Sequence, residues 1–236
     1  MGTLPPPRDD DTATPSSSSS CRRYAEEPDS ACALCPRLSE FRSLNRVQYP
    51  DFHNAPVPAF GPLDSEILIV GLAPGLKGAN RTARPFTGDW AGDLLYPTLC
   101  EFALAQGVYG ANPNDGLTLC NCRITNAVRC VPPQNKVTAH EVRNCGVFLR
   151  HEIAAMPNLR AILALGGVAH GGVLAALGYK KSAYRFAHNA RHRLTPDLFL
   201  LDSYHCSRYN TNTGRLTAKM FRDVFKTLTT YIAPAP

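Results

Sequence analysis

Four short apolar segments, each followed by a turn and a helical pattern, constrain the fold of this chain more than any other feature. They are residues 66–72, 122–128, 160–165 and 198–203. Helical patterns follow at 93–106, 138–155 and 171–177, and a last helix begins after Thr217 as its N-cap. Strands that alternate with helices are typical of a parallel sheet covered on both faces. The pattern therefore predicts an α/β protein, a three-layer α/β/α fold with a central four-stranded parallel sheet.

Length and composition indicate one folded domain behind a tail. A chain of 236 residues with 44% hydrophobic residues can bury one core. Residues 1–29 are rich in proline, aspartate and serine and contain no apolar stretch for a secretory signal. We therefore predict a disordered N-terminal tail over 1–29 and a folded domain over 30–236.

No run of about 18 apolar residues occurs, so we expect no membrane span. Without a secretory signal we expect a cytoplasmic protein. The formal net charge of +6 shifts the expected partner modestly toward a polyanion such as nucleic acid.

A glycine-rich segment, GLAPGLKGANRTARPFTGDWAG over residues 71–92, follows the first predicted strand. Such a turn can bind phosphate through its backbone N–H groups. A Walker loop needs Gly-Lys-Ser/Thr at its end, and a dinucleotide fingerprint needs glycines that open a helix. The segment lacks the first, and Pro74 and Pro85 interrupt the second. We therefore predict a long ordered loop with a functional role, and we do not favour a phosphoryl-transfer enzyme.

The cysteines favour a metal site. The chain has nine, of which Cys32 and Cys35 form a C-x-x-C pair, while Cys130 and Cys145 lie far downstream. In a chain without an export signal, cysteines in this number indicate metal binding more often than disulfides. Four thiolates in this arrangement can hold a tetrahedral zinc ion or an iron–sulfur cluster, and spacing alone does not choose between them.

Polar residues follow three of the four predicted strands, at the edge where ligands bind in parallel sheets. The set contains a single aspartate and a single histidine among amides and basic residues, which suits recognition of a nucleobase beside a phosphate backbone. Its members are Asn80, Arg81, Asp89, Asn126, Asn135, Lys136, His205, Ser207, Arg208, Asn210, Asn212 and Arg215.

Residues 32–217 resemble family 5 (type b) of the uracil-DNA glycosylase superfamily, whose members carry an iron–sulfur cluster. The resemblance depends on GLAPG, GANRT, RPFTGD and AGDLLY in the first loop, on AVRCVPPQNK, on the four cysteines and on TGRLT. It implies a monomer that flips a deaminated base out of DNA and hydrolyses its N-glycosidic bond. Uracil is the expected base, and hypoxanthine and xanthine are further candidates. The resemblance also implies association with the nucleoid when the protein acts on DNA.

The resemblance also implies residue roles. Cys32, Cys35, Cys130 and Cys145 match the ligands of a 4Fe-4S cluster. Asp89 matches the catalytic carboxylate, His205 the histidine that bonds to the departing base, and Asn135 is a second catalytic candidate. The expected substrate-binding residues are Gly71, Ala73, Pro74, Gly75, Asn80, Phe86, Asn126 and Ser207. The expected DNA-binding residues are Arg208, Tyr209, Asn210 and Arg215.

Several alternatives stay open from the residues alone. Asp89 can be the N-cap of the next helix, and Phe86 can be an ordinary core residue. The basic stretch 185–193 can contact phosphates or form a solvated charged face. The leading alternative function is a non-catalytic iron–sulfur protein that binds DNA or senses redox state.

Overall fold

The computed structural model describes residues 26–232, so most of the predicted tail lies outside the described residues. The main sheet has five strands in the order β4-β1-β5-β7-β6. Their bounds are Ile67–Gly71 for β1, Cys122–Asn126 for β4, Ala161–Leu165 for β5, Arg191–Arg193 for β6 and Phe199–Ser203 for β7.

The four predicted strands form the parallel centre of this sheet. In register, Ile67 of β1 is paired with Cys122 of β4 and with Ala161 of β5, and Ala161 is paired with Phe199 of β7. The short strand β6 extends the sheet and runs antiparallel to β7. Its sequence, Arg-His-Arg, has no apolar alternation, so the strand pattern could not reveal it.

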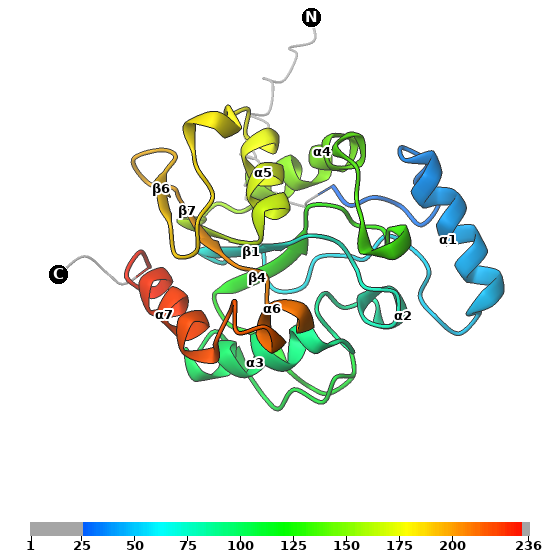
Figure 1. Ribbon diagram of the computed structural model, residues 1–236, viewed down its shortest axis with the longest axis horizontal. Coiled ribbons are helices and arrows are strands. Elements are labelled where there is room, and N and C mark those ends of the chain that lie inside the picture. The colour runs from blue at the N-terminus through cyan, green and yellow to red at the C-terminus, as the bar shows by residue number, and fades with distance from the viewer. Residues whose placement is uncertain (1–25, 233–236) are drawn as a thin grey trace, which may run out of the picture.

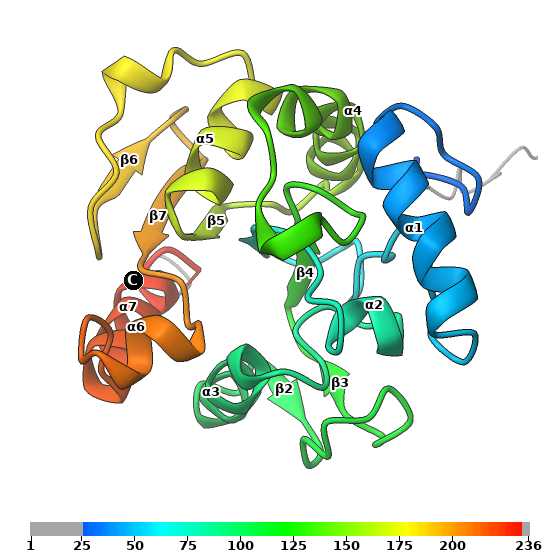
Figure 2. The same cartoon turned by 45° about the vertical axis from the view of Figure 1, so that its right-hand side comes forward.

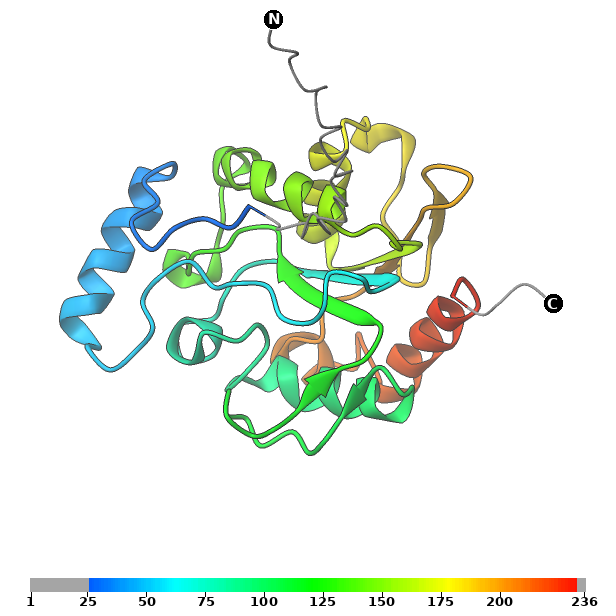
Figure 3. The ribbon, with the colours of Figure 1, turned by 180° about the vertical axis from the view of Figure 1, so that it is seen from behind.

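Helices cover both faces of the sheet, as Figure 1 and the reverse view in Figure 3 show. Ile67 and Ile69 belong to the core cluster on one face, together with residues of α3 (Trp90–Glu101) and α7 (Ala218–Thr229). Leu68 and Val70 belong to the cluster on the other face, with residues of α4 (Ala139–Ala155) and α5 (Gly167–Ala176). The three-layer α/β/α prediction is confirmed.

Two helix starts with a side-chain cap were predicted well. Thr217 accepts a hydrogen bond from the Met220 N–H at 3.1 Å, and Thr138 forms a reciprocal capping box with Glu141 before α4. The predicted helix 171–177 begins earlier, at Gly167, because β5 passes directly into α5 through Gly166, which has φ of 99°. The glycines there hide the helical pattern.

The prediction of a helix over 93–106 is wrong at both ends. Helix α3 begins at Trp90 and ends at Glu101, after which Ala103 adopts a left-handed φ of 56°. The chain then forms β2 (Ala105–Gln106), which pairs with β3 (Thr118–Leu119) in a separate ribbon. Apolar residues continue across this turn, so hydrophobic spacing alone extends the helix too far.

Helix α1 (Pro36–Gln48) was not predicted, and Figure 2 shows it beside α4. Its buried residues are Leu38, Arg42 and Asn45. Two of these are polar, so the helix lacks the apolar stripe by which a buried face is recognised. The remaining short helices are α2 (Ala79–Thr82), α6 (Arg208–Asn212) and the 3-10 turns Pro133–Asn135 and Lys181–Ala183.

Glu27 lies in the predicted tail and contacts the predicted domain. Glu27 forms ion pairs with Arg129 and Arg123, and its carboxylate accepts a hydrogen bond from the Ala59 N–H at 3.2 Å. The domain boundary predicted at residue 29 stays a prediction, since the described residues begin only at residue 26. Within residues 26–232, no helix has the length and apolar character needed to cross a bilayer.

Candidate active site

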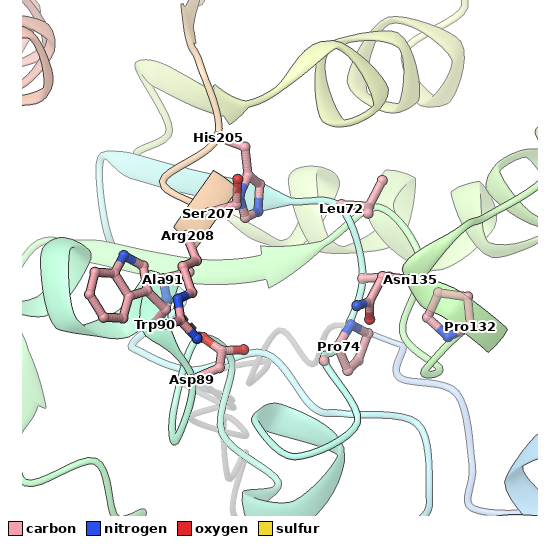
Figure 4. Close-up of a pocket in the computed structure, with 12 residues that line it drawn as sticks. Leu72, Pro74, Asp89, Trp90, Ala91, Pro132, Asn135, His205, Ser207 and Arg208 are labelled. Carbon is pink, nitrogen blue, oxygen red and sulfur yellow. Dashed lines mark hydrogen bonds between the residues drawn. The ribbon is translucent and has the colours of Figure 1, made fainter. Parts of the chain in front are cut away.

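A cavity of about 340 Å³ opens at the carboxyl edge of the parallel strands. Figure 4 shows its lining, which comes from the loop after β1, the start of α3, the loop after β4 and the segment after β7. The lining residues are Leu72, Ala73, Pro74, Gly75, Asp89, Trp90, Ala91, Pro132, Asn135, His205, Ser207 and Arg208. Each predicted loop therefore contributes to one site.

A smaller inner cavity of about 30 Å³ shares part of this lining. Phe86 and Asn126 line it together with residues that also face the outer cavity: Ala73, Pro74, Gly75, Asp89, Ala91 and His205. An aromatic ring, an amide, a carboxylate and an imidazole thus meet around one enclosed space.

Asp89 both caps α3 and lines the two cavities. Its Oδ1 accepts a hydrogen bond from the Ala91 N–H at 3.2 Å, and its Oδ2 lies over Gly75 and Gly78. Burial raises the pKa of the Asp89 carboxyl above its usual value, and hydrogen bonds from the N–H groups of Ala91 and Gly92 oppose that rise. The capping role and the pocket position are therefore compatible.

Glycines hold the Asp89 carboxylate at close range. A Cβ atom added to Gly78 would lie 2.3 Å from Asp89 Oδ2, and one added to Gly75 would lie 3.0 Å from the same atom. Any side chain at residue 78 would collide with this carboxylate. The loop backbone can therefore lie this close to Asp89 only because residue 78 is glycine.

His205 lies just after β7 and is partly buried. Its ring stacks on Phe86 with centroids 5.9 Å apart, and its backbone carbonyl accepts a hydrogen bond from Asn210 Nδ2 at 2.8 Å. Burial lowers the pKa of His205 to about 4. The imidazole is therefore neutral at neutral pH and offers one N–H donor.

Phe86 is fixed in a left-handed conformation with φ of 53°, which is rare for a bulky residue. Its carbonyl accepts a hydrogen bond from the Tyr109 hydroxyl at 3.2 Å. A Cβ atom on Gly71 would lie 2.4 Å from Asn126 Oδ1 and 2.5 Å from Phe86 Cζ. Gly71 therefore contributes indirectly, because its missing side chain leaves the space that Phe86 and Asn126 occupy.

Asn135 is exposed and lines the outer cavity across from Asp89, as Figure 4 shows. Its φ of 56° follows the φ of 55° at Gln134, so two successive left-handed residues present this side chain. Ser207 caps α6 by accepting from the Asn210 N–H at 3.5 Å, and it lines the same cavity.

Some predicted site residues lie elsewhere. Asn80 is buried outside both cavities, and its Nδ2 donates to Asn54 Oδ1 at 2.9 Å, so it supports the loop. The guanidinium of Arg215 lies 4.7 Å from the centroid of the Tyr204 ring, and Tyr209 is 71% exposed outside the cavity. The amide of Asn210 is engaged with the His205 carbonyl.

Four lining residues were not among the predicted site residues: Leu72, Trp90, Ala91 and Pro132. Trp90 stands directly after Asp89, and Pro132 lies two residues after Cys130 in AVRCVPPQNK, so position in the quoted motifs was the available signal.

The four predicted cysteines converge on a separate small cavity, where Leu38, Val128 and Phe148 also lie. Two sulfur atoms accept hydrogen bonds: Cys130 Sγ from Arg42 Nη1 and Cys145 Sγ from the Arg129 N–H, each at 3.3 Å. Burial raises the pKa of Cys145 to about 12. Thiolates at this position therefore need a cation in addition to these donors.

The sulfur atoms lie farther apart than the four ligands of a bound zinc ion do. Tetrahedral zinc with Zn–S bonds of about 2.3 Å brings its sulfurs to about 3.8 Å from one another. Across residues 26–232, only His170, His192 and Asp202 form a group of three histidine, cysteine or acidic side chains whose ligand atoms all lie within 4.8 Å. No three of the four cysteine sulfur atoms therefore all lie within 4.8 Å of one another.

That histidine–aspartate group lies away from the candidate active site lining. Asp202 on β7 is paired with His170 Nδ1 at 2.8 Å and with His192 Nε2 at 3.0 Å. Each oxygen of the Asp202 carboxylate thus has one histidine partner at ordinary hydrogen-bond length. These two hydrogen bonds join α5 and β6 to β7.

The fold and the site define a class that the comparisons with known proteins identify. Residues 58–229 match the Uracil DNA glycosylase superfamily, and the chain belongs to this family. It is 44% identical over 200 residues to a Type-5 uracil-DNA glycosylase of Thermus thermophilus. The aligned residues cover 83% of this chain and 91% of the relative.

Two further relatives place the chain within the superfamily. A Type-5 uracil-DNA glycosylase of Pyrobaculum aerophilum is 38% identical, with 83% of this chain and 86% of the relative covered. A Type-4 uracil-DNA glycosylase of Thermotoga maritima is 36% identical over 140 residues, which is 58% of each chain. The similarity to the Type-5 proteins is therefore more extensive.

Proposed function

We propose that this protein removes uracil from DNA by hydrolysing the N-glycosidic bond, which leaves an abasic site. The family and the names of its relatives support this activity. The observation that carries the proposal is the inner cavity, which brings Asp89, Phe86, Asn126 and His205 together at one end of the sheet.

The side chains suit the two charges that develop as the bond breaks. The base becomes negative, and the neutral His205 can donate its N–H to a base carbonyl. The sugar becomes positive, and the Asp89 carboxylate can stabilise it and orient water. Phe86 offers a stacking surface, while the Asn126 amide can donate and accept at the pyrimidine edge.

Asn135 is the alternative group for positioning water. It faces the outer cavity opposite Asp89, whereas Leu72 and Ala73 contribute no polar side chain. We assign the role to Asp89 because it also reaches the inner cavity, where the base would lie.

We further propose that Cys32, Cys35, Cys130 and Cys145 hold a 4Fe-4S cluster. The wide sulfur spacing and the N–H donor to Cys145 support a cluster over a single zinc ion. When bound, the cluster supplies a cross-link between the segment before α1, the loop after β4 and helix α4, and the excision chemistry is left to the other site.

The partner that we propose is DNA that contains deaminated bases, bound by a monomer in the compartment that holds the DNA. The net charge of +6 favours such a polyanion. Hypoxanthine and xanthine remain further candidate bases.

The test uses purified protein on duplexes that carry one uracil, hypoxanthine, xanthine or mismatched thymine, with alkaline cleavage of the abasic product. We expect strand cleavage at uracil. Binding to every duplex without cleavage of any would instead support the non-catalytic DNA-binding alternative.

A further inference from the structure

Trp90 is a large aromatic residue at the mouth of the outer cavity. It is the first residue of α3, directly after Asp89, and it is 46% exposed. Figure 4 shows its ring beside Arg208, which extends from α6 toward Trp90 and Asp89. An exposed tryptophan contributes little to the core, so its position calls for another explanation.

Two contacts join Trp90 to α6. The indole Nε1 donates a hydrogen bond to Thr211 Oγ1 at 2.8 Å, and the Arg208 Cζ atom lies 5.4 Å from the centroid of the Trp90 ring. These contacts connect the helix that begins at Asp89 with the helix that follows His205. The two segments that carry the proposed catalytic groups are thus linked across the cavity mouth.

Arg208 extends toward the Asp89 carboxylate but forms no ion pair with it within 4.0 Å. Among the ion pairs that residues 26–232 form within 4.0 Å, none includes Arg208, and the side chain is exposed. A guanidinium that stacks on a ring keeps its N–H groups in the plane available for another acceptor. A phosphate matches that planar donor set well.

We propose that Trp90 is a positioning residue that holds Arg208 for a DNA phosphate beside the flipped nucleotide. This inference rests on the proposed function and adds a contact to it. Stacking restricts the rotamers of a long side chain before DNA arrives, so less conformational entropy is lost on binding. The Thr211 hydrogen bond fixes the indole in the orientation that the stacking needs.

The experiment measures the salt dependence of binding, which a purely structural role would not change. The probe is a labelled duplex with a tetrahydrofuran abasic analogue, which cannot be cleaved, and fluorescence anisotropy gives Kd at several salt concentrations. Losing one phosphate contact lowers the slope of log K against log salt by about 0.9. We expect that loss for Arg208→Ala.

The Trp90 variants test the positioning role. We expect Trp90→Ala to weaken binding about two- to fivefold at low salt and to lower the slope toward that of Arg208→Ala. Trp90→Phe keeps an aromatic ring and should retain most of the slope. The double variant Trp90→Ala/Arg208→Ala should bind no worse than Arg208→Ala alone, because both changes remove one contact.

Lys219→Ala is the matched control, since it removes one exposed positive charge from α7. It should leave the slope unchanged. An unchanged slope in Trp90→Ala, or additive losses in the double variant, would overturn the proposal, as would a wild-type protein that does not bind the duplex. A wild type that binds with the expected slope but excises no uracil would contradict the proposed function and leave the Trp90 contact supported.

Discussion

At the scale of single residues, the candidate site depends on groups whose ionisation is shifted by burial. Asp89 and His205 lie at the same inner cavity, and burial moves both toward the neutral form. For His205 the neutral form is the useful one, because its N–H can bond to a departing base. For Asp89 the charged form is the useful one, and the N–H groups at the start of α3 favour it.

The pH dependence follows from these shifts. The pKa of His205 is lowered to about 4, so the imidazole stays neutral until the pH falls well below the usual histidine value. The raised pKa of Asp89 means that its charge is lost at a higher pH than for an ordinary carboxyl group. We expect single-turnover uracil excision to be flat around neutral pH and to fall toward acid pH as Asp89 is protonated.

The measurement is the single-turnover rate across that range in buffers of equal ionic strength. A rate that rises as the pH falls through about 6.5 would mean that protonated His205 is the active form.

Asn126 provides a test of selectivity. If its amide reads the pyrimidine edge, Asn126→Ala should lose more activity on uracil than on hypoxanthine, since a good bidentate contact contributes about 1–3 kcal/mol of discrimination. The comparison uses kcat/KM on two duplexes that differ only in the lesion. Equal losses on both would show that Asn126 only supports the cavity wall.

At the scale of elements, the loop between β1 and α3 determines where the carboxylate lies. Two of its glycines differ in how well they would tolerate a side chain. An added Cβ would lie 2.3 Å from Asp89 Oδ2 at Gly78 but 3.0 Å from it at Gly75. The loop therefore offers two matched substitutions of one methyl group each.

We expect Gly78→Ala to slow excision more strongly than Gly75→Ala, by at least about tenfold, because misplacing a catalytic group by about 1 Å can cost about 100-fold. Both variants should stay folded by circular dichroism. Similar rates in the two variants would argue against a positional requirement on Asp89.

The elements also show what the sequence could reveal. Apolar runs identify β1, β4, β5 and β7, and Thr138 and Thr217 mark helix starts, because hydrophobic spacing and capping are local signals. Helix α1 buries Arg42 and Asn45, and β6 is Arg-His-Arg, so neither has a local apolar pattern. Their places depend on contacts with distant segments.

The same division applies to the candidate site. Asp89, His205, Phe86 and Asn126 were predicted from motifs, and the structure brings all four to one cavity. Asn80 belongs to the same motif but is turned toward Asn54, a contact that spacing cannot show. Trp90 was missed because its role depends on Thr211 and Arg208, over a hundred residues away.

At the scale of the whole molecule, the cysteine site joins segments that are far apart in sequence. Cys32 and Cys35 precede α1, Cys130 follows β4 and Cys145 lies on α4. The surrounding core cluster is small, with Leu38 and Val128 as its buried apolar members. A cluster that bridges these segments would therefore supply much of their mutual stability.

We expect the purified protein to be brown and to contain about four iron atoms per chain, with broad visible absorbance. Cys130→Ser should lower iron content, solubility and Tm, while any soluble fraction keeps measurable uracil excision. Iron analysis and thermal unfolding are the measurements. Colourless protein with one zinc ion would contradict the cluster.

The central claim is that the inner cavity performs uracil excision, and single-turnover kinetics of two variants test it most directly. Removing one preorganised group typically costs about 100- to 1,000-fold in rate. Asp89→Asn and His205→Ala should each slow excision by about that factor, while DNA affinity stays within about threefold because phosphate contacts elsewhere dominate binding. Near wild-type excision by Asp89→Asn, together with an inactive Asn135→Ala, would contradict the account and assign the water to Asn135.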